Sequence, residues 1–258
     1  METECNADIE ENKHWISDCG SIVLHNGDAK SCLSSFYEFG ADALITDPIY
    51  GLDHRSMRSG ANKKRAKSAY TSDGLFSDTP EEVESFVVPV IADLIANVDM
   101  AVVTPGNKCF TMYPPPDSFG CLYQPASPSF QSFGYADCQP IFYYGTPANG
   151  NAGKRCSFVV KHNAEGRQIS WHPCPKPISV VSWMVTEHCK EDAVICDPYL
   201  GSGTTAVAAV RHGKRFIGAE IVPEYFQKLV ARVRDEIGRF NWLSGQSAIK
   251  QKEGNDGN

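Results

Sequence analysis

The sequence predicts a doubly wound α/β fold, in which helices cover both faces of a mostly parallel sheet. In the last third of the chain, apolar residues at helical spacing (178–188, 204–211 and 223–237) alternate with short apolar runs (193–196 and 215–220). Strands that alternate with helices need crossover connections, which make neighbouring strands parallel. The 258 residues, 42% of them hydrophobic and 21% charged, suffice for the core of one large globular domain.

The first part of the chain shows the same alternation. Residues 21–28 predict a strand that ends in a turn, and residues 29–40 predict a helix that Gly40 closes. Residues 43–46 predict a short buried strand. The remaining elements expected here are a helix over 79–98, with Thr79 as N-cap, Pro80 at its first position and a kink at Pro89, and a strand within 99–106.

Residues 105–147 have a different texture, because they hold 8 of the 16 prolines and 10 of the 27 aromatic residues. Such a stretch cannot form one long helix. We expect short strands and loops here, with "QPIFYYGT" (139–146) as the clearest strand. The fold class therefore includes a small irregular lobe beside the sheet.

The composition excludes several classes of protein. No apolar run approaches the roughly 18 residues of a membrane span, and the polar, acidic start does not resemble a signal peptide. The ten cysteines include no C-x-x-C pair, so the sequence predicts no zinc or other metal site. We expect buried, reduced thiols in a cytoplasmic protein rather than a structural disulfide.

The stretch "CDPYLGSGTT" (196–205) has the pattern of a strand end, a glycine turn and a helix start. Gly201 and Gly203 leave the backbone bare, and ligands of parallel sheets bind where strands end. Glu220 closes the next predicted strand and can accept hydrogen bonds from two ribose hydroxyls. Neither a dinucleotide nor a phosphate-loop pattern is present, so the ligand expected is S-adenosylmethionine. Alternatively, the glycines only shape a tight turn.

Four stretches resemble the amino-group DNA methyltransferases, which modify adenine N6 or cytosine N4. They are "ALITDPIYG" (43–51), "GYADCQPIFYYG" (134–145), "WHPCPKP" (171–177) and "DPYLGSGTTAVAAVRHGKRFIGAEIVPEY" (197–225). The catalytic stretch precedes the cofactor stretch, as in the permuted, beta-type branch of this family. The resemblance implies a circularly permuted, Rossmann-like S-adenosylmethionine-dependent methyltransferase fold, with residues from about 105 to 170 as a target-recognition insertion.

The resemblance also assigns catalytic roles. Asp47 would accept a proton of the target amine, the Pro48 carbonyl would accept its second N–H, and Tyr50 would stack on a base turned out of the duplex. An Asp at the head of the motif favours adenine N6 over cytosine N4. Ile49 stands where a second proline is usual, which leaves the backbone less restricted. Asp47 and Pro48 could instead form a simple turn.

For the cofactor, the resemblance places Lys176 and Pro177 beside the methionine end and Asp28 beside the adenine. Asp28 could equally be a helix N-cap, and we expect His172 to be a packed turn residue. The complete predicted cofactor set is Asp28, Lys176, Pro177, Asp197, Tyr199, Gly201, Ser202, Gly203, Thr204 and Glu220.

The chain carries a formal charge of −7, but one segment is strongly basic. Residues 51–72 are expected to form a mobile loop in which Arg55, Arg58, Lys63, Lys64, Arg65 and Lys67 contact the phosphates of double-stranded DNA. A merely solvated loop is the alternative. We expect a flexible N-terminus (1–18), a methyltransferase domain (19–243) and a flexible tail (244–258). The short insertion suggests a short target sequence or a homodimer.

The sequence therefore predicts a site-specific adenine-N6 DNA methyltransferase that acts by base flipping and direct transfer. A cytosine-N4 enzyme of the same fold is the first alternative. Ile49 would suit a catalytically inactive module that binds DNA or cofactor, and the acidic net charge would suit an N-methyltransferase with a substrate other than DNA.

Overall fold

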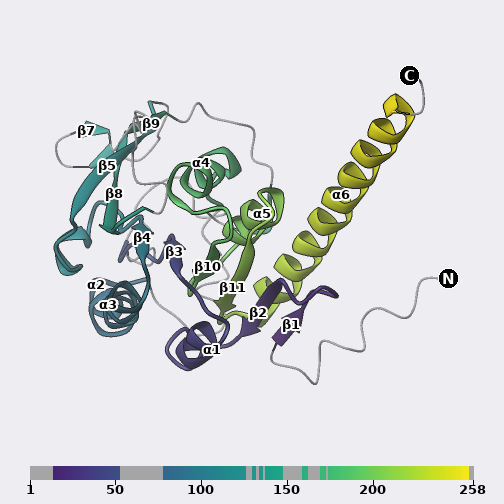
Figure 1. Ribbon diagram of the computed structural model, residues 1–258. Coiled ribbons are helices and arrows are strands. Elements are labelled where there is room, and N and C mark those ends of the chain that lie inside the picture. Colours follow the sequence, from purple (N-terminus) through teal and green to yellow (C-terminus); the bar gives the residue numbers. More distant parts are fainter. Residues whose placement is uncertain are drawn as a thin grey trace.

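The computed structural model describes residues 14–52, 78–125, 130–131, 134–135, 137–147, 159–161, 169–172 and 174–255. Its main feature is a nine-stranded sheet with helices on both sides (Figure 1). The strand order is β1 (His14–Ile16), β2 (Ile22–Asn26), β11 (Arg215–Glu220), β10 (Val194–Asp197), β3 (Ala43–Thr46), β4 (Met100–Val103), β8 (Cys138–Gly145), β5 (Ser118–Tyr123) and β9 (Val159–Lys161).

The five central strands, from β2 to β4, are parallel. Strand β1 pairs antiparallel with β2, and β8 pairs antiparallel with β4, so the sheet reverses direction on both sides of this parallel centre. This arrangement confirms the mostly parallel sheet predicted for the chain.

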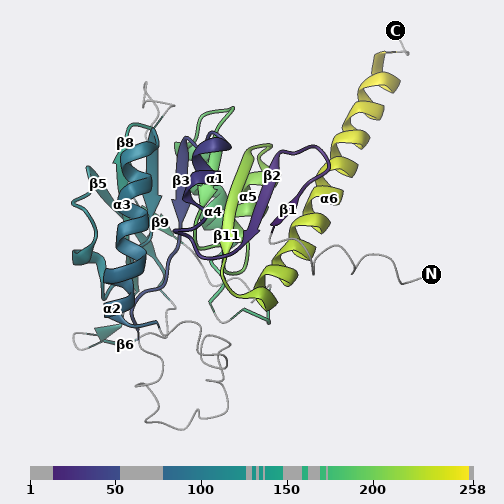
Figure 2. The same cartoon turned by 90° about the horizontal axis from the view of Figure 1, so that it is seen from below.

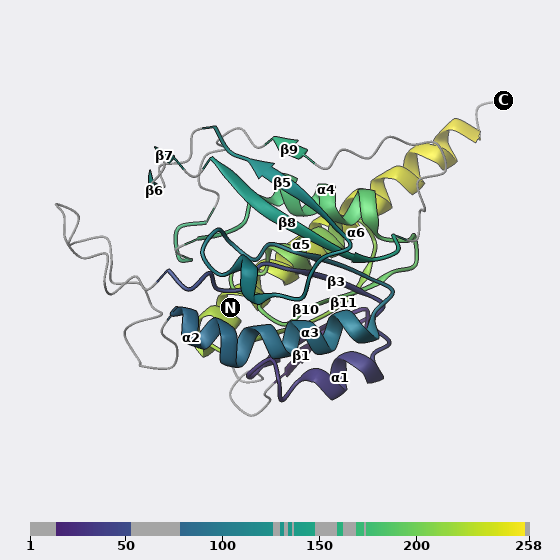
Figure 3. The same ribbon diagram turned by 90° about the vertical axis from the view of Figure 1, so that its left-hand side faces the viewer.

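Helices cover the sheet on both faces, as the views from below and from the side show (Figures 2 and 3). One face carries α1 (Leu33–Glu38), α2 (Pro80–Glu82), the π-helical turn η2 (Val83–Val87) and α3 (Val88–Asn97). The other carries α4 (Ile178–His188), α5 (Thr204–Arg211) and α6 (Pro223–Asn255). A short 3-10 helix η3 (Phe110–Met112) and a separate pair, β6 (Phe130–Gln131) and β7 (Gly134–Tyr135), complete the described elements.

Two apolar clusters form the core, one on each face. Successive residues of a strand point to opposite faces, so Ala43 and Ile45 pack in the cluster with α4 to α6, whereas Leu44 packs in the cluster with α1 and α3. Both faces of the central strands are therefore buried. This double burial is why these strands appear in the sequence as continuous apolar runs rather than as alternating patterns.

The predicted helices 178–188 and 204–211 and the predicted strands 43–46 and 215–220 are confirmed to the residue. The Thr79 side chain caps the helix that starts at Pro80, accepting from the Glu82 N–H at 3.3 Å. In place of a simple kink at Pro89, the helix widens into the π turn η2 just before it. A proline has no N–H to donate, so the local hydrogen-bond pattern changes there.

Several boundaries differ from the expectation. Residues 14–16, expected to be flexible, form β1 because they pair with β2. Helix α6 extends to Asn255 instead of ending near 237, since no proline interrupts the later residues. Strands β5, β8 and β9 continue the central sheet, so this part of the expected lobe is not separate from it.

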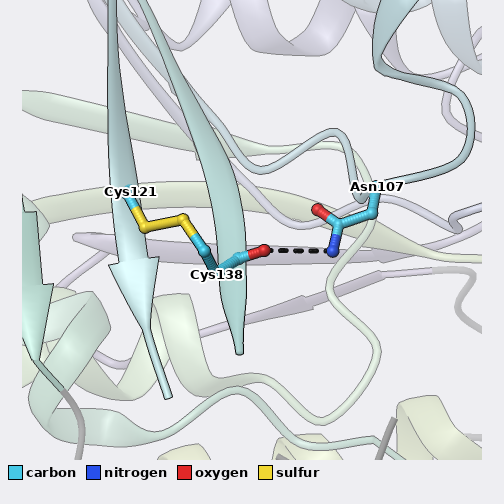
Figure 4. The surroundings of a disulfide bond; sticks show 3 residues. All are labelled: Asn107, Cys121 and Cys138. Atoms are coloured by element: carbon cyan, nitrogen blue, oxygen red, sulfur yellow. Dashed lines mark hydrogen bonds between the residues drawn. A yellow bond between two sulfur atoms is a disulfide. The ribbon is translucent and has the colours of Figure 1, made fainter. Parts of the chain in front are cut away.

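The structure contains a disulfide, which the sequence analysis did not expect (Figure 4). Cys121 on β5 and Cys138 on β8 have their Cα atoms 6.0 Å apart, within the usual span of a disulfide. In the β5–β8 register, Cys138 pairs with Tyr123, so the two cysteines are diagonal neighbours. Strand pairing brings them together, and their spacing along the chain gives no sign of it. In the described part of the chain, no helix is both long enough and apolar enough to span a membrane.

Candidate active site

The site lies where the sheet changes winding direction, between β10 and β3. From β10 the chain crosses to β11 on one side, and from β3 it crosses to β4 on the other. Ligands bind at such switch points, beyond the carboxyl ends of the strands. Asp197 ends β10 and Asp47 follows β3, and the Thr46 hydroxyl donates to Asp197 Oδ1 at 2.7 Å. The fold therefore brings together two acids that are far apart in the sequence.

A cavity of about 890 Å³ opens at this point. This volume is typical of sites for cofactors and other small ligands. Its wall includes all the predicted catalytic residues and all the predicted cofactor residues except Gly203. The structure thus joins the motif around Asp47 and the motif around Gly201 into one site.

At one end of the cavity, Asp47 is the centre of a hydrogen-bond network. Its Oδ1 accepts from the hydroxyls of Tyr50 and Thr104, and it forms an ion pair with Lys176 Nζ at 2.9 Å. Lys176 Nζ also donates to the Tyr50 hydroxyl at 2.7 Å and to Gln139 Oε1 at 3.3 Å. Burial, and then the charge of Asp47, raises the pKa of Tyr50 well above its usual value, so this hydroxyl stays protonated and can donate.

The Tyr50 ring is held against the backbone of the next strand end. Gly106, just beyond β4, has φ +70°, and a Cβ on it would lie 2.5 Å from Tyr50 Cγ. Only glycine allows this approach. The ring is therefore fixed at the cavity wall with its hydroxyl directed at Asp47.

The two glycines of the turn have different surroundings. Gly201 has φ +51°, and a Cβ there would lie 3.0 Å from Nε2 of the buried His172. Gly203 has φ +75°, and its Cβ would lie 3.1 Å from Leu229 Cβ on α6. Gly201 thus faces the cavity, whereas Gly203 allows α6 to pack closely. His172 packs beside the Tyr225 ring, with centroids 5.0 Å apart, as expected of a packed turn residue.

Glu220 sits beneath the glycine turn. Its Oε2 accepts from the Gly201 N–H at 2.7 Å and its Oε1 from the Val222 N–H at 2.8 Å. Burial raises the pKa of Glu220 to about 7, although these two backbone donors act in the opposite direction. Burial likewise raises the pKa of Asp197 to about 6, against hydrogen bonds from Thr205 and Thr46.

The remaining predicted residues line the cavity in varied roles. Asp28 accepts from the Ser31 N–H at 3.0 Å, so it supports the turn before α1 and also faces the cavity. Tyr199 donates from its hydroxyl to the Phe86 carbonyl at 3.3 Å. Pro177 directly precedes α4. Arg55, Arg58, Lys63, Lys64, Arg65 and Lys67 lie outside the described residues.

The structure adds residues that the sequence analysis did not select. Thr104 follows β4 in the same way that Asp47 follows β3. Its position at the end of a predicted strand could therefore have identified it as a candidate site residue. Arg232 on α6 donates from Nη1 to the Ser202 carbonyl at 2.7 Å and to Thr204 Oγ1 at 3.1 Å. Gln139 and the 60% exposed Phe86 also line the cavity. No local motif marks Arg232 or Phe86, and Gln139 lies within the stretch "GYADCQPIFYYG" (134–145) without having been selected from it.

Comparison with known proteins agrees with this geometry. Residues 106–231 match the family model described as DNA methylase. The type II methyltransferase M2.DpnII of Streptococcus pneumoniae is 37% identical over 89 residues, which are 33% of this chain and 32% of that protein. M2.LlaDCHI of Lactococcus lactis subsp. cremoris is 35% identical over 80 residues, or 30% of each chain. The matched segment thus spans about a third of these relatives.

Solved structures cover more of the chain at lower identity. The M1.HpyAVI–SAM complex aligns with a TM-score of 0.55 and 18% identity, covering 82% of this chain and 98% of that one. The PvuII DNA methyltransferase (cytosine-N4-specific) aligns with a TM-score of 0.55 and 13% identity, covering 85% and 92%. The likeness shows that this chain has the fold of DNA methyltransferases. Residues 106–231, just under half of the chain, thus match the DNA methylase family, and the likeness in fold extends over most of the chain.

Proposed function

We propose that the protein is a DNA methyltransferase that transfers a methyl group from S-adenosylmethionine to the exocyclic N6 of adenine. One observation carries this proposal. A single cavity contains both the Asp47 network and the glycine turn with its buried acid Glu220. The match to the DNA methylase family model supports the reaction class, and a structural neighbour solved as a SAM complex supports the cofactor.

The residues around the glycine turn fit the cofactor. A carboxylate offers about four acceptor positions, and two backbone donors occupy two of those on Glu220, which leaves acceptors for two ribose hydroxyls. Gly201 has no side chain of its own and lines the cavity with its backbone. Asp28 lines the same cavity and would face the adenine. When bound, S-adenosylmethionine supplies an electrophilic methyl group.

At the other end of the cavity, the residues fit an amino group. Its nitrogen lone pair is delocalised into the base, so an acceptor for its proton strengthens the nucleophile. In our proposal Asp47 accepts one N–H and takes the proton as the N–C bond forms, and the Pro48 carbonyl accepts the other. Tyr50 stacks on the base, which must first leave the duplex. Transfer is direct, and positioning and electrostatics lower the barrier.

The choice of adenine rests on the Asp at the head of the "DPIY" motif (47–50). Cytosine N4 is the second candidate, favoured by the structural likeness to the cytosine-N4-specific PvuII enzyme. DNA as the partner is supported by the basic segment 55–67 and by the family. The type II relatives suggest a role in a restriction-modification system.

The decisive experiment incubates the purified protein with unmethylated DNA and S-adenosylmethionine, then identifies methylated nucleosides by mass spectrometry. We expect N6-methyladenine, reduced at least about 100-fold in Asp47→Ala because the proton acceptor is lost. Asp99→Ala is the matched control. The Asp99 carboxyl is exposed, and Asp99 directly precedes β4, at the end of the strand that is away from the cavity.

N4-methylcytosine would keep the reaction class and overturn the choice of base. No methylated base, despite measurable cofactor binding, would point to an inactive module or to another substrate. In that case Ile49→Pro tests whether the missing proline of the motif is responsible.

A further inference from the structure

The catalytic end of the cavity already holds a cation. We propose that the Lys176 ammonium occupies, in the free protein, the position that the target amine takes during reaction. Lys176 must then withdraw from Asp47 before a base can be methylated. This inference rests on the proposed function, and it adds to it a positioning residue that controls entry of the base.

The first observation is the arrangement of acceptors around Lys176 Nζ. The carboxylate of Asp47 lies at 2.9 Å, the Tyr50 hydroxyl at 2.7 Å and Gln139 Oε1 at 3.3 Å. An ammonium has three N–H donors, so these three oxygens satisfy it fully. The Lys176 side chain is only 11% exposed, so little water competes for these bonds.

The same contacts occupy one of the two oxygens of the carboxylate that is proposed to accept from the target amine. Oδ1 of Asp47 receives Tyr50, Thr104 and Lys176 together. A carboxylate oxygen with three donors has no position left for a fourth. An amine can reach this oxygen only if one donor leaves, and Lys176 is the donor on the flexible side chain.

The distances to the Tyr50 ring locate the ammonium more closely. Lys176 Nζ lies 2.7 Å from the Tyr50 hydroxyl and 5.4 Å from the ring centroid, so it lies beyond the hydroxyl and near the plane of the ring. The ammonium thus lies between the Tyr50 hydroxyl and the Asp47 carboxylate and leaves the face of the ring uncovered.

Neighbouring strands and prolines restrict the position of Lys176. Gln139 lies on β8, where it pairs with Leu122 of β5. Its neighbour Cys138 forms the disulfide to Cys121, and the Cys138 carbonyl accepts from Asn107 Nδ2 at 3.0 Å (Figure 4). Pro175 and Pro177 restrict the backbone on both sides of Lys176. The lysine is thus held by two strands and a stiff segment.

The consequence is selective entry. Withdrawal of Lys176 leaves Asp47 without its cation. A ligand that offers N–H donors to the carboxylate restores this contact, and an exocyclic amine on a base offers them. A ligand confined to the glycine turn offers none, so it leaves Lys176 on Asp47.

The test measures binding of 2′-deoxyadenosine, without cofactor, to wild type and to Lys176→Met by calorimetry. Methionine keeps the apolar stem and removes the competing cation. We expect the variant to bind roughly tenfold more tightly, which corresponds to about 1.4 kcal/mol. The gain should vanish when Asp47→Asn is added, because it depends on the uncovered carboxylate. Lys190→Met, which breaks an ion pair with Asp42 outside the cavity, should bind as wild type does.

Gln139→Leu provides a second test that does not depend on correct folding of Lys176→Met. It removes one of the three acceptors of Lys176 and leaves the lysine in place, so a smaller gain in the same direction is expected. With an active preparation, Lys176→Met should also lower KM for DNA without raising kcat. The affinity of Lys176→Met for S-adenosylmethionine distinguishes this role from the cofactor contact that the family resemblance assigns to Lys176.

Unchanged nucleoside affinity in both variants would overturn the proposal. So would weaker cofactor binding by Lys176→Met, which would make Lys176 a cofactor residue instead. Failure of wild type to methylate any DNA is a separate result. It would defeat the proposed function, while the nucleoside-binding cycle would still decide whether Lys176 occupies an amine site.

Discussion

Glu220 is a buried acid of the cavity whose protonation depends strongly on its surroundings. Burial holds its pKa at about 7, near the pH at which the protein would work. Two backbone donors already use part of its carboxylate. The ionised form therefore accepts further hydrogen bonds from a ribose better than the protonated form does.

We predict that affinity for S-adenosylmethionine falls as the pH decreases from 8 to 6. Protonation through the pKa of about 7 converts one acceptor oxygen of Glu220 into a donor. Titration calorimetry at each pH measures this. Glu220→Gln should bind more weakly at pH 8 and show little dependence on pH. An unchanged pH dependence in this variant would assign the effect to another group.

The same pKa has a consequence for stability. The folded value is raised above the ordinary value of 4.5, so the neutral form is favoured in the native state. Its contribution to stability is fully present below pH about 4.5 and is lost as the pH rises through about 7. Relative to Glu220→Gln, the free energy of unfolding of wild type should decrease across this window, which urea denaturation at several pH values checks.

Gly201 provides a test of the glycine turn. We predict that Gly201→Ala is destabilised by about 1 kcal/mol or more, because φ is +51° and the new methyl meets His172. It should also lose cofactor affinity. Gly40→Ala is the matched control, since φ there is +82° and nothing lies within 4 Å. The control should show the backbone cost in urea denaturation and retain cofactor affinity.

At the scale of elements, helix α6 does more than cover the sheet. Its Leu229 packs on Gly203, and its Arg232 donates to Ser202 and Thr204. Helix α6, which follows the glycine turn in the chain, therefore packs against this turn and binds it through hydrogen bonds. The preceding turn η2 contributes Phe86 to the same cavity from the opposite face of the sheet.

We predict that Arg232→Met lowers the free energy of unfolding by about 2 kcal/mol, the usual range for hydrogen bonds from a charged donor. The Ser202 carbonyl, on a buried residue, would lose this partner. Cofactor affinity should fall as well because the turn loosens. Lys228→Met removes only an i,i+4 pair with Glu224 and should change neither quantity appreciably. Equal effects of both variants in denaturation and binding would contradict this role.

At the scale of the whole molecule, charge is unevenly distributed. The chain carries −7 overall, yet six cations lie from Arg55 to Lys67, in the segment that follows the "DPIY" motif (47–50). Asp47 precedes Arg55 by only eight residues in the sequence. Phosphate contacts determine most of the salt dependence of DNA binding.

We predict that replacing Arg55, Arg58, Lys63, Lys64, Arg65 and Lys67 by Gln weakens DNA binding and flattens its dependence on salt. The slope of log K against log salt should decrease by roughly 0.9 for each phosphate that the variant no longer neutralises. Fluorescence anisotropy at several salt concentrations measures both effects. Cofactor affinity should stay unchanged. An unaltered slope would make this segment a solvated loop without a role in DNA binding.

The sequence by itself determined most of the elements that position the site. Continuous apolar runs predicted β3, β10 and β11, because strands buried on both faces need apolar residues throughout. Helical spacing predicted α4 and α5 to the residue. Glu220 ends β11 and Gly201 lies in the turn after β10, so local pattern selected both. The family resemblance selected Asp47 and supplied its proposed role.

The tertiary structure decided what these residues contact. Strand pairing places β10 beside β3 and so joins two motifs that are about 150 residues apart in the sequence. Packing of distant elements brings Lys176 to Asp47, Arg232 to the glycine turn and Cys121 to Cys138. Each of these contacts depends on register and side-chain direction across separate elements. A local sequence pattern carries no information on either, because both follow from how the whole chain packs.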